Sequence, residues 1–152
     1  MNIFSAFNIN ASGMSAQRYR MDIISENVAN AQSTRTEDGT PYRRKVVAFA
    51  EKGGNGSFVH ALNSAIGYHG AGCSGSGVKI TGVYKDYETE MKMVYDPSHP
   101  DANEDGYVTM PNVSIITEMT NMIDASRAFE ANATAFNASK SMVQQGLQLG
   151  QS

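Results

Sequence analysis

The fold of this chain is decided by its C-terminal stretch VSIITEMTNMIDASRAFEANATAFNASKSMVQQGLQ, residues 113–148. Apolar residues recur in it at every seventh position over about four heptads, which is typical of one long helix with a single apolar stripe. We expect Asn112 to be the N-cap of this helix and Gly150 to end it. The stripe consists of Ile115, Met122, Phe129, Phe136 and Val143.

A second helix is predicted over about residues 3–30 and ends before the polar run QSTRTEDGTP. Its apolar stripe has the same spacing and consists of Phe7, Met14, Met21 and Val28. The two stripes together predict an intrasubunit helix seam, in which the terminal helices pack against each other. Gly13 lies inside this helix, where glycine costs roughly 1 kcal/mol relative to alanine, so a neighbouring helix is expected to approach closely there.

The middle of the chain predicts strands rather than helices. Residues 41–50, 78–84 and 87–95 have the composition or alternation of strands and are expected to form a small antiparallel unit. Residues from about 51 to 77 are rich in Gly, Ser and Asn and predict a loop. The chain is therefore expected to be α+β. Its predicted parts are an N-terminal helix at 1–32, an extended or β-rich middle region at 33–111, and a C-terminal helix at 112–152.

Composition excludes several classes of function. The formal net charge of −3 gives no electrostatic support for binding nucleic acid. The single cysteine excludes an internal disulfide and a cysteine-based zinc site. No apolar run approaches the roughly 20 residues of a membrane span, so direct membrane insertion is not expected. The N-terminus lacks the basic start and apolar core of a cleavable secretory signal.

The faces of the C-terminal helix outside the stripe carry little charge. A solvated helix face is usually richer in charge than this, and small uncharged residues suit a helix that is surrounded by other helices. Two interpretations remain open, namely an ordinary helix pair within the subunit, and a pair that also packs against neighbouring subunits. The residues expected to meet neighbours in the second case are Asn27, Asn30, Asn132 and Asn137.

The stretch DANEDGYVTMPN, residues 101–112, matches the first half of an EF-hand calcium loop at Asp101, Asp105 and Gly106. The bidentate Glu required at position twelve is replaced by Asn112. Prolines also stand where the helix leading into the loop should be. We therefore interpret the stretch as a turn that precedes the C-terminal helix, and a calcium-binding module at 101–112 is the less favoured alternative.

No enzyme site is predicted from the residues. The histidines His60, His69 and His99 share no ligand spacing, and no serine, cysteine or threonine lies in a nucleophile motif. The glycines that begin at Gly70 form a G-x-G-x-x-G pattern without the strand-to-helix context of a dinucleotide site. We therefore expect no catalytic residue, no metal and no cofactor.

Three segments resemble the bacterial flagellar rod and hook family. Residues 11–34 resemble its N-terminal helix and contain the motif S-x-N-x-A-N, which begins at Ser25. Residues 38–45, DGTPYRRK, resemble the segment that follows this helix. Residues 95–142 are similar to the C-type proximal rod proteins. Two departures are Glu26, where the motif often has a second Asn, and the stretch 51–77, which matches no family pattern.

The resemblance implies a structural protein of the bacterial flagellar basal body. Its members pair their terminal helices into the inner layer of a helical tube, which transmits motor torque as a periplasmic rod. They are exported by the flagellar type III system without a cleaved signal. The implied partners are copies of itself, other proximal and distal rod proteins, the basal-body adaptor, and components of the membrane ring and export gate. A distal rod or hook-type axial protein is the alternative within the family, although those proteins are typically longer.

Overall fold

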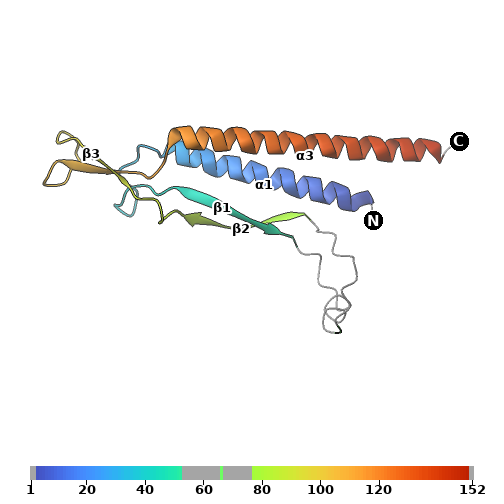
Figure 1. The fold of residues 1–152 in the computed structure, drawn as a ribbon, viewed down its shortest axis with the longest axis horizontal. Coiled ribbons are helices and arrows are strands. Elements are labelled where there is room, and N and C mark those ends of the chain that lie inside the picture. Colours follow the sequence, from blue (N-terminus) through green and yellow to red (C-terminus); the bar gives the residue numbers. More distant parts are fainter. Residues whose placement is uncertain (1–2, 53–65, 67–76, 151–152) are drawn as a thin grey trace. The chain divides into compact units, whose positions relative to one another are not determined.

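The computed structural model describes residues 3–52, 66 and 77–150. Two long helices are separated in the sequence by short strands, so the predicted α+β class is confirmed (Figure 1). The elements are α1 (Ile3–Ala29), β1 (Lys45–Glu51), β2 (Val78–Lys85), β3 (Lys92–Tyr95), β4 (Tyr107–Met110) and α3 (Ile115–Leu149).

Both predicted helices are present, and the start of α3 needs one correction. The backbone N–H of Glu118 donates to the carbonyl oxygen of Ser114 at 2.9 Å, so Ser114 and not Asn112 occupies the N-cap position. Asn112 lies too far before the helix to cap it, and its carboxamide bonds to other segments. The prediction of Asn112 as a helix cap is therefore wrong.

The chain divides into two compact units. Unit 1 contains Met1–Ala16, Phe49–Thr81 and Ala128–Ser152, and unit 2 contains Gln17–Ala48 and Gly82–Arg127. In each unit a length of α1 lies beside a length of α3 (Figure 1).

In unit 1 the two helices come very close together. The rings of Phe7 and Phe136 meet edge to face, with centroids 5.0 Å apart. A Cβ added to Gly13 would lie 2.9 Å from Oδ1 of Asn132, so only glycine leaves room for that side chain. The close approach of a helix that was predicted at Gly13 is confirmed, and the helix is α3.

Strands β1 and β2 form a two-stranded sheet. The backbone N–H of Asp86 donates to the carbonyl oxygen of Arg44, and that of Lys52 donates to Gly77, so the two strands run antiparallel. The strand predicted at 78–84 is confirmed, and the strand predicted at 41–50 is confirmed from Lys45 onward. Most of the predicted loop at 51–77 lies outside the described residues.

Strands β3 and β4 form an antiparallel hairpin, in which Tyr95 pairs with Tyr107. The Asn103 side chain accepts the backbone N–H of Tyr107 at 2.7 Å, and Gly106 adopts a φ of 80°, which favours glycine. The EF-hand-like stretch therefore forms the end of the hairpin turn. The second half of the same stretch contains strand β4, which was not predicted.

Strand β3 is shorter than the strand predicted at 87–95 because a turn replaces its first half. The carboxylate of Asp86 accepts the backbone N–H groups of Glu88 and Thr89 and the hydroxyl of Thr89. These local bonds hold the backbone in a turn and leave it unavailable to a strand partner.

Candidate functional site

Unit 2 contains a buried network of polar side chains, which we call the junction. It joins the end of α1, the start of β1, the turn after β2, the segment before α3 and the first turn of α3. Its members are Asn27, Tyr42, Arg44, Lys45, Asp86, Asn112 and Glu118.

Asn27 lies at the centre of the junction, where it is buried. Its Nδ2 donates to the carbonyl oxygen of Lys45 at 2.8 Å and to Oε2 of Glu118 at 3.0 Å. Its Oδ1 accepts the hydroxyl of Tyr42 and the backbone N–H of Lys45, both at 2.9 Å. All the hydrogen-bonding capacity of the side chain is used, and only an amide offers donors and acceptors in this arrangement.

Glu118 places a carboxylate in this interior, with 1% of its surface exposed. Its Oε1 accepts Nε of Arg44 at 2.8 Å, while Oε2 is held by Asn27. A second nitrogen of Arg44 lies 3.6 Å from the carboxylate of Asp86. A buried charge is tolerated when it is paired and its remaining lone pairs are bonded, and both conditions hold here.

Asn112 connects three segments of unit 2. Its Oδ1 accepts the backbone N–H of Arg44 at 2.8 Å, and its Nδ2 donates to the carbonyl oxygens of Asp86 at 3.0 Å and Thr89 at 3.2 Å. The segment before α3 is therefore anchored to the start of β1 and to the turn after β2. This role was not predicted, because nothing in the sequence indicates which segment faces Asn112.

Two members of the junction, Tyr42 and Asp86, have shifted pKa values. Burial, followed by the nearby charges of Glu26 and Glu118, raises the pKa of Tyr42 to about 12. Hydrogen bonds from the backbone and side chain of Thr89 lower the pKa of Asp86. Burial opposes them, and the Glu88 backbone and the Arg44 charge add smaller lowering effects. Both shifts favour the forms that already dominate at neutral pH, namely the protonated phenol and the ionised Asp86.

The polar atoms of the junction are bonded to one another, which fixes the geometry of unit 2. Within residues 3–52, 66 and 77–150, no group of three or more His, Cys, Asp and Glu side chains is placed to hold a metal ion. The chemical role of the junction is to lock five segments of unit 2 together.

The structure contradicts the assignment of Asn27 to contacts with neighbours, because that side chain is saturated inside unit 2. Asn30 bonds to the carbonyl oxygen of Glu26 and accepts the hydroxyl of Ser33. Asn132 lies against Gly13 and donates to the carbonyl oxygen of Ala128. Asn137 is exposed, and its contact with a neighbour stays a prediction.

The predicted seam residues differ in their surroundings. Phe7 and Phe136 meet, whereas Ile115 is 44% exposed. The remaining six are half-buried, namely Met14, Met21, Val28, Met122, Phe129 and Val143. The buried helix positions are Ile24 and several small or polar residues, such as Ala16, Asn27 and Ala125. Sequence reasoning missed the small and polar ones because it searched only for large apolar residues.

The acidic residues of the hairpin turn also have separate roles. Asp101 accepts the hydroxyl of Thr34 at 2.8 Å and lies 3.9 Å from Arg35, so it ties the turn to the segment after α1. Asp105 is exposed, and Gly106 provides the positive φ of the turn. Asp101 thus binds the segment after α1, whereas Asp105 faces solvent.

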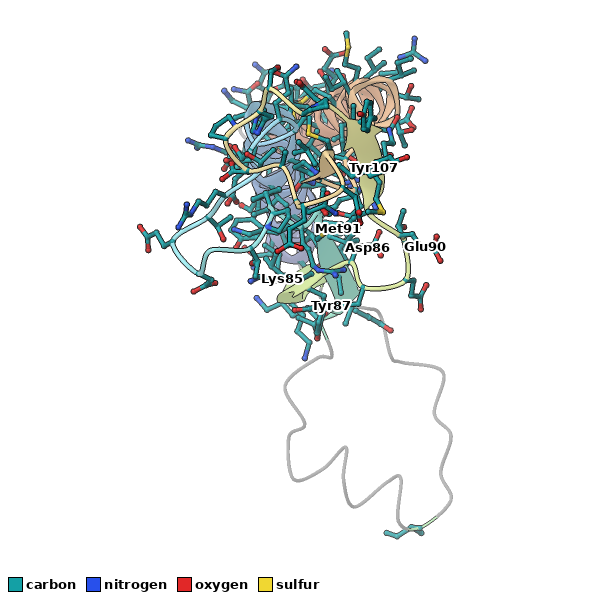
Figure 2. All side chains as sticks on the ribbon, turned by 90° about the vertical axis from the view of Figure 1, so that its left-hand side faces the viewer. Lys85, Asp86, Tyr87, Glu90, Met91 and Tyr107 are labelled. Carbon is teal, nitrogen blue, oxygen red and sulfur yellow. The ribbon has the colours of Figure 1, made fainter. Side chains whose placement is uncertain are left out.

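A polar groove of about 870 Å³ lies beside the junction in unit 2. Its walls carry charges of both signs, including Arg43, Lys85 and Asp38. The guanidinium of Arg43 stands 4.6 Å from the centroid of the Tyr87 ring, a cation–π contact. Lys85, Tyr87 and Met91, labelled in Figure 2, also line the groove. Glu26, the departure from the family motif, pairs with Lys45 in this groove.

None of the described helices is both long enough and apolar enough to cross a membrane.

Comparisons with known proteins agree on one family. A family model described as "Flagella basal body rod protein" matches residues 7–35. A second, described as "Flagellar basal body rod FlgEFG protein C-terminal", matches residues 104–149. The two matches cover α1 and the region from the hairpin turn through α3.

Full-length relatives extend this likeness over the whole chain. Flagellar basal-body rod protein FlgC of Bacillus subtilis is 42% identical over 154 residues, covering 99% of each chain. FlgC of Borreliella burgdorferi is 42% identical with 97% of each chain covered. FlgC of Escherichia coli O6:H1 is 37% identical, over 99% of this chain and 100% of that protein. The chain therefore belongs to the FlgC family of flagellar basal-body rod proteins.

Proposed function

We propose that the chain is a structural subunit of the proximal rod of the bacterial flagellar basal body. The observation that carries the proposal is the identity of 42% to FlgC of Bacillus subtilis over 99% of both chains. A longer distal rod or hook protein would leave part of its length unmatched. The role is mechanical, since the subunit joins others in a helical tube that transmits motor torque.

The surface of α3 supports assembly with other subunits. Of the five charged residues along this helix, Glu118 is buried, which leaves Asp124, Arg127, Glu130 and Lys140 on its exposed faces. A 35-residue helix with so few exposed charges presents a surface that is easily desolvated by protein. Contacts between different surfaces of successive subunits then generate a helical array.

The junction supports the transmission of torque. Packed and fully bonded interiors deform little, so a twist applied to one helix is passed to the segments locked to it. In unit 2 the bonds of Asn27, Arg44 and Glu118 join α1, β1 and α3 in this way.

The proposed partners are copies of the chain, other proximal and distal rod proteins, the basal-body adaptor, and membrane-ring and export-gate components. We also propose that the flagellar type III system exports the chain into the periplasm without cleaving a signal. These proposals rest on family membership and not on a contact seen in the structure.

The test replaces the corresponding gene of a flagellated host with the gene for this chain. We expect rods in isolated basal bodies and swimming cells. The variant Phe129→Asp should be secreted but should not assemble. Position 129 is half-buried in the helix, and the burial of an unpaired carboxylate there is costly. Phe129→Leu should swim. Basal bodies that lack the wild-type chain, or normal swimming of Phe129→Asp, would contradict the proposal.

A further inference from the structure

An apolar groove of about 430 Å³ lies in unit 2 between the end of α1 and the start of α3. We call it the socket, and its lining is Ser25, Val28, Ala29, Glu118, Met119, Met122 and Ile123. Met119 is 58% exposed and Ile123 is 52% exposed, so large apolar side chains form an open rim. The only charged side chain of the socket is Glu118, which Arg44 and Asn27 already bind. The socket therefore suits an uncharged, apolar occupant.

The other end of α3 carries apolar side chains of the kind that the socket would accept. In unit 1, Phe7 faces Phe136 and Gly13 faces Asn132, which places the first residue of α1, Ile3, opposite about residue 140 of α3. From there α3 continues to Leu149, about two turns beyond the start of α1 (Figure 1). We call residues 141–148 the ridge; Met142 is 66% exposed and Leu147 is 64% exposed.

We propose that the ridge of one copy docks in the socket of a second copy. The proposal rests on the proposed function and specifies one subunit contact within it. The polarity of the surfaces favours this occupant, because the ridge sequence SMVQQGLQ has no charged residue and the one carboxylate of the socket is already paired. Neither surface has to strip water from an unpaired charge on contact.

The contact joins two different surfaces, so it leaves a free socket on one copy and a free ridge on the other. Such heterologous contacts extend into open arrays and do not close as dimers. Met119 and Leu147 lie on the same helix, separated by about 40 Å of helical rise, so one chain cannot bring them together. A covalent link between these positions therefore reports a contact between two copies.

The experiment uses cysteine cross-linking in basal bodies from a host whose own gene is replaced. The starting variant is Cys73→Ser, to which Met119→Cys and Leu147→Cys are added. After mild oxidation, a non-reducing gel should show dimers and larger species, while each single variant should stay monomeric. The matched control pairs Met119→Cys with Thr134→Cys, an exposed position elsewhere on α3, and should give no ladder. A third pair, Met119→Cys with Tyr95→Cys, tests the exposed hairpin as the occupant.

Immunoblotting of the same basal bodies separates the possible failures. If the chain is present and no ladder forms, or if the Thr134 or Tyr95 pair cross-links equally well, the socket contact is rejected and the proposed function stands. If the wild-type chain is absent from basal bodies, the proposed function itself fails. Should the double-cysteine variant not assemble, Leu147→Lys and Gln148→Lys replace it. Loss of incorporation for Leu147→Lys alone supports the contact, and equal behaviour of the two rejects it.

Discussion

Asn27 shows how much of the structure depends on one polar residue. Its replacement by alanine would leave the hydroxyl of Tyr42 and the backbone N–H of Lys45 without their shared acceptor. Glu118 would also lose a donor. We expect Asn27→Ala to lower the free energy of unfolding by about 3 kcal/mol, since unsatisfied buried polar groups cost about 1–3 kcal/mol each.

The measurement is urea unfolding followed by tyrosine fluorescence, because the chain has no Trp and Tyr42, Tyr95 and Tyr107 lie in unit 2. The control is Asn137→Ala, an exposed asparagine on α3, which should change the free energy by less than about 0.5 kcal/mol. Similar effects of the two substitutions would mean that the junction contributes little to stability.

The pKa of Tyr42 predicts a loss of stability at high pH. Below pH 10 the phenol is neutral in both the folded and the unfolded chain, so its contribution is fully present. As the pH rises, the unfolded chain ionises first, because the folded protein holds the pKa at about 12. The free energy of unfolding should therefore fall more steeply between pH 10 and 12 in the wild type than in Tyr42→Phe. Tyr84→Phe, at an exposed tyrosine, should keep the slope of the wild type.

Single residues were the hardest level to predict from the sequence. The sequence identified the motif that contains Asn27 and the segment that contains Tyr42. It did not predict that Asn27 bonds to Tyr42 and to Glu118. Asn27 and Glu118 are 91 positions apart, and a hydrogen bond between them has no local signature. Polar residues on helices are mostly exposed, so Asn27 was predicted to lie on the outer surface.

At the level of the helices, the contact between Gly13 and Asn132 sets how closely α1 and α3 approach in unit 1. A methyl group at Gly13 would meet Oδ1 of Asn132 at 2.9 Å, so the Asn132 side chain or the helices would have to shift. Such overpacking costs about 1–3 kcal/mol, against a gain of roughly 1 kcal/mol in helix propensity. We expect Gly13→Ala to lower the free energy of unfolding by about 1 kcal/mol.

Gly146 offers a matched comparison, since it also lies inside a helix but an added Cβ would meet nothing within 4 Å. Gly146→Ala should raise helix stability by up to about 1 kcal/mol. Far-ultraviolet circular dichroism during urea unfolding measures both variants. If both substitutions stabilise the chain equally, the close approach at Gly13 has no energetic consequence.

Element types were largely predictable, because seven-residue apolar spacing and strand alternation are local properties. The first half of the predicted strand at 87–95 was lost to the Asp86 turn, whose bonds to Glu88 and Thr89 compete with strand pairing. Strand β4 was missed because it is only four residues long and follows a turn with an EF-hand-like pattern. The strand that pairs with it, β3, lies on the other side of that turn.

On the scale of the whole molecule, the two units differ in what holds them together. Unit 2 contains the junction, with a buried ion pair between Arg44 and Glu118 and saturated asparagines. In unit 1 the helices meet at the Phe7–Phe136 ring pair and where Asn132 packs on Gly13, and of the described residues that are buried only Ala16 belongs to this unit. Local opening is easiest where few buried contacts must be broken. In a free subunit we therefore expect unit 1 to open far more readily than unit 2.

Hydrogen exchange on the purified monomer measures this difference within single helices. Amides in residues 17–29 of α1 should exchange slowly, and those in residues 5–16 should exchange quickly, although both belong to one helix. In α3, residues 119–127 should be protected and residues 128–149 should not. In assembled rods the fast segments should become slow, because contacts with neighbours would then cover them. Uniform strong protection of both helices in the monomer would mean that α1 and α3 need no neighbour to be ordered, and assembly would then join helices that are already rigid.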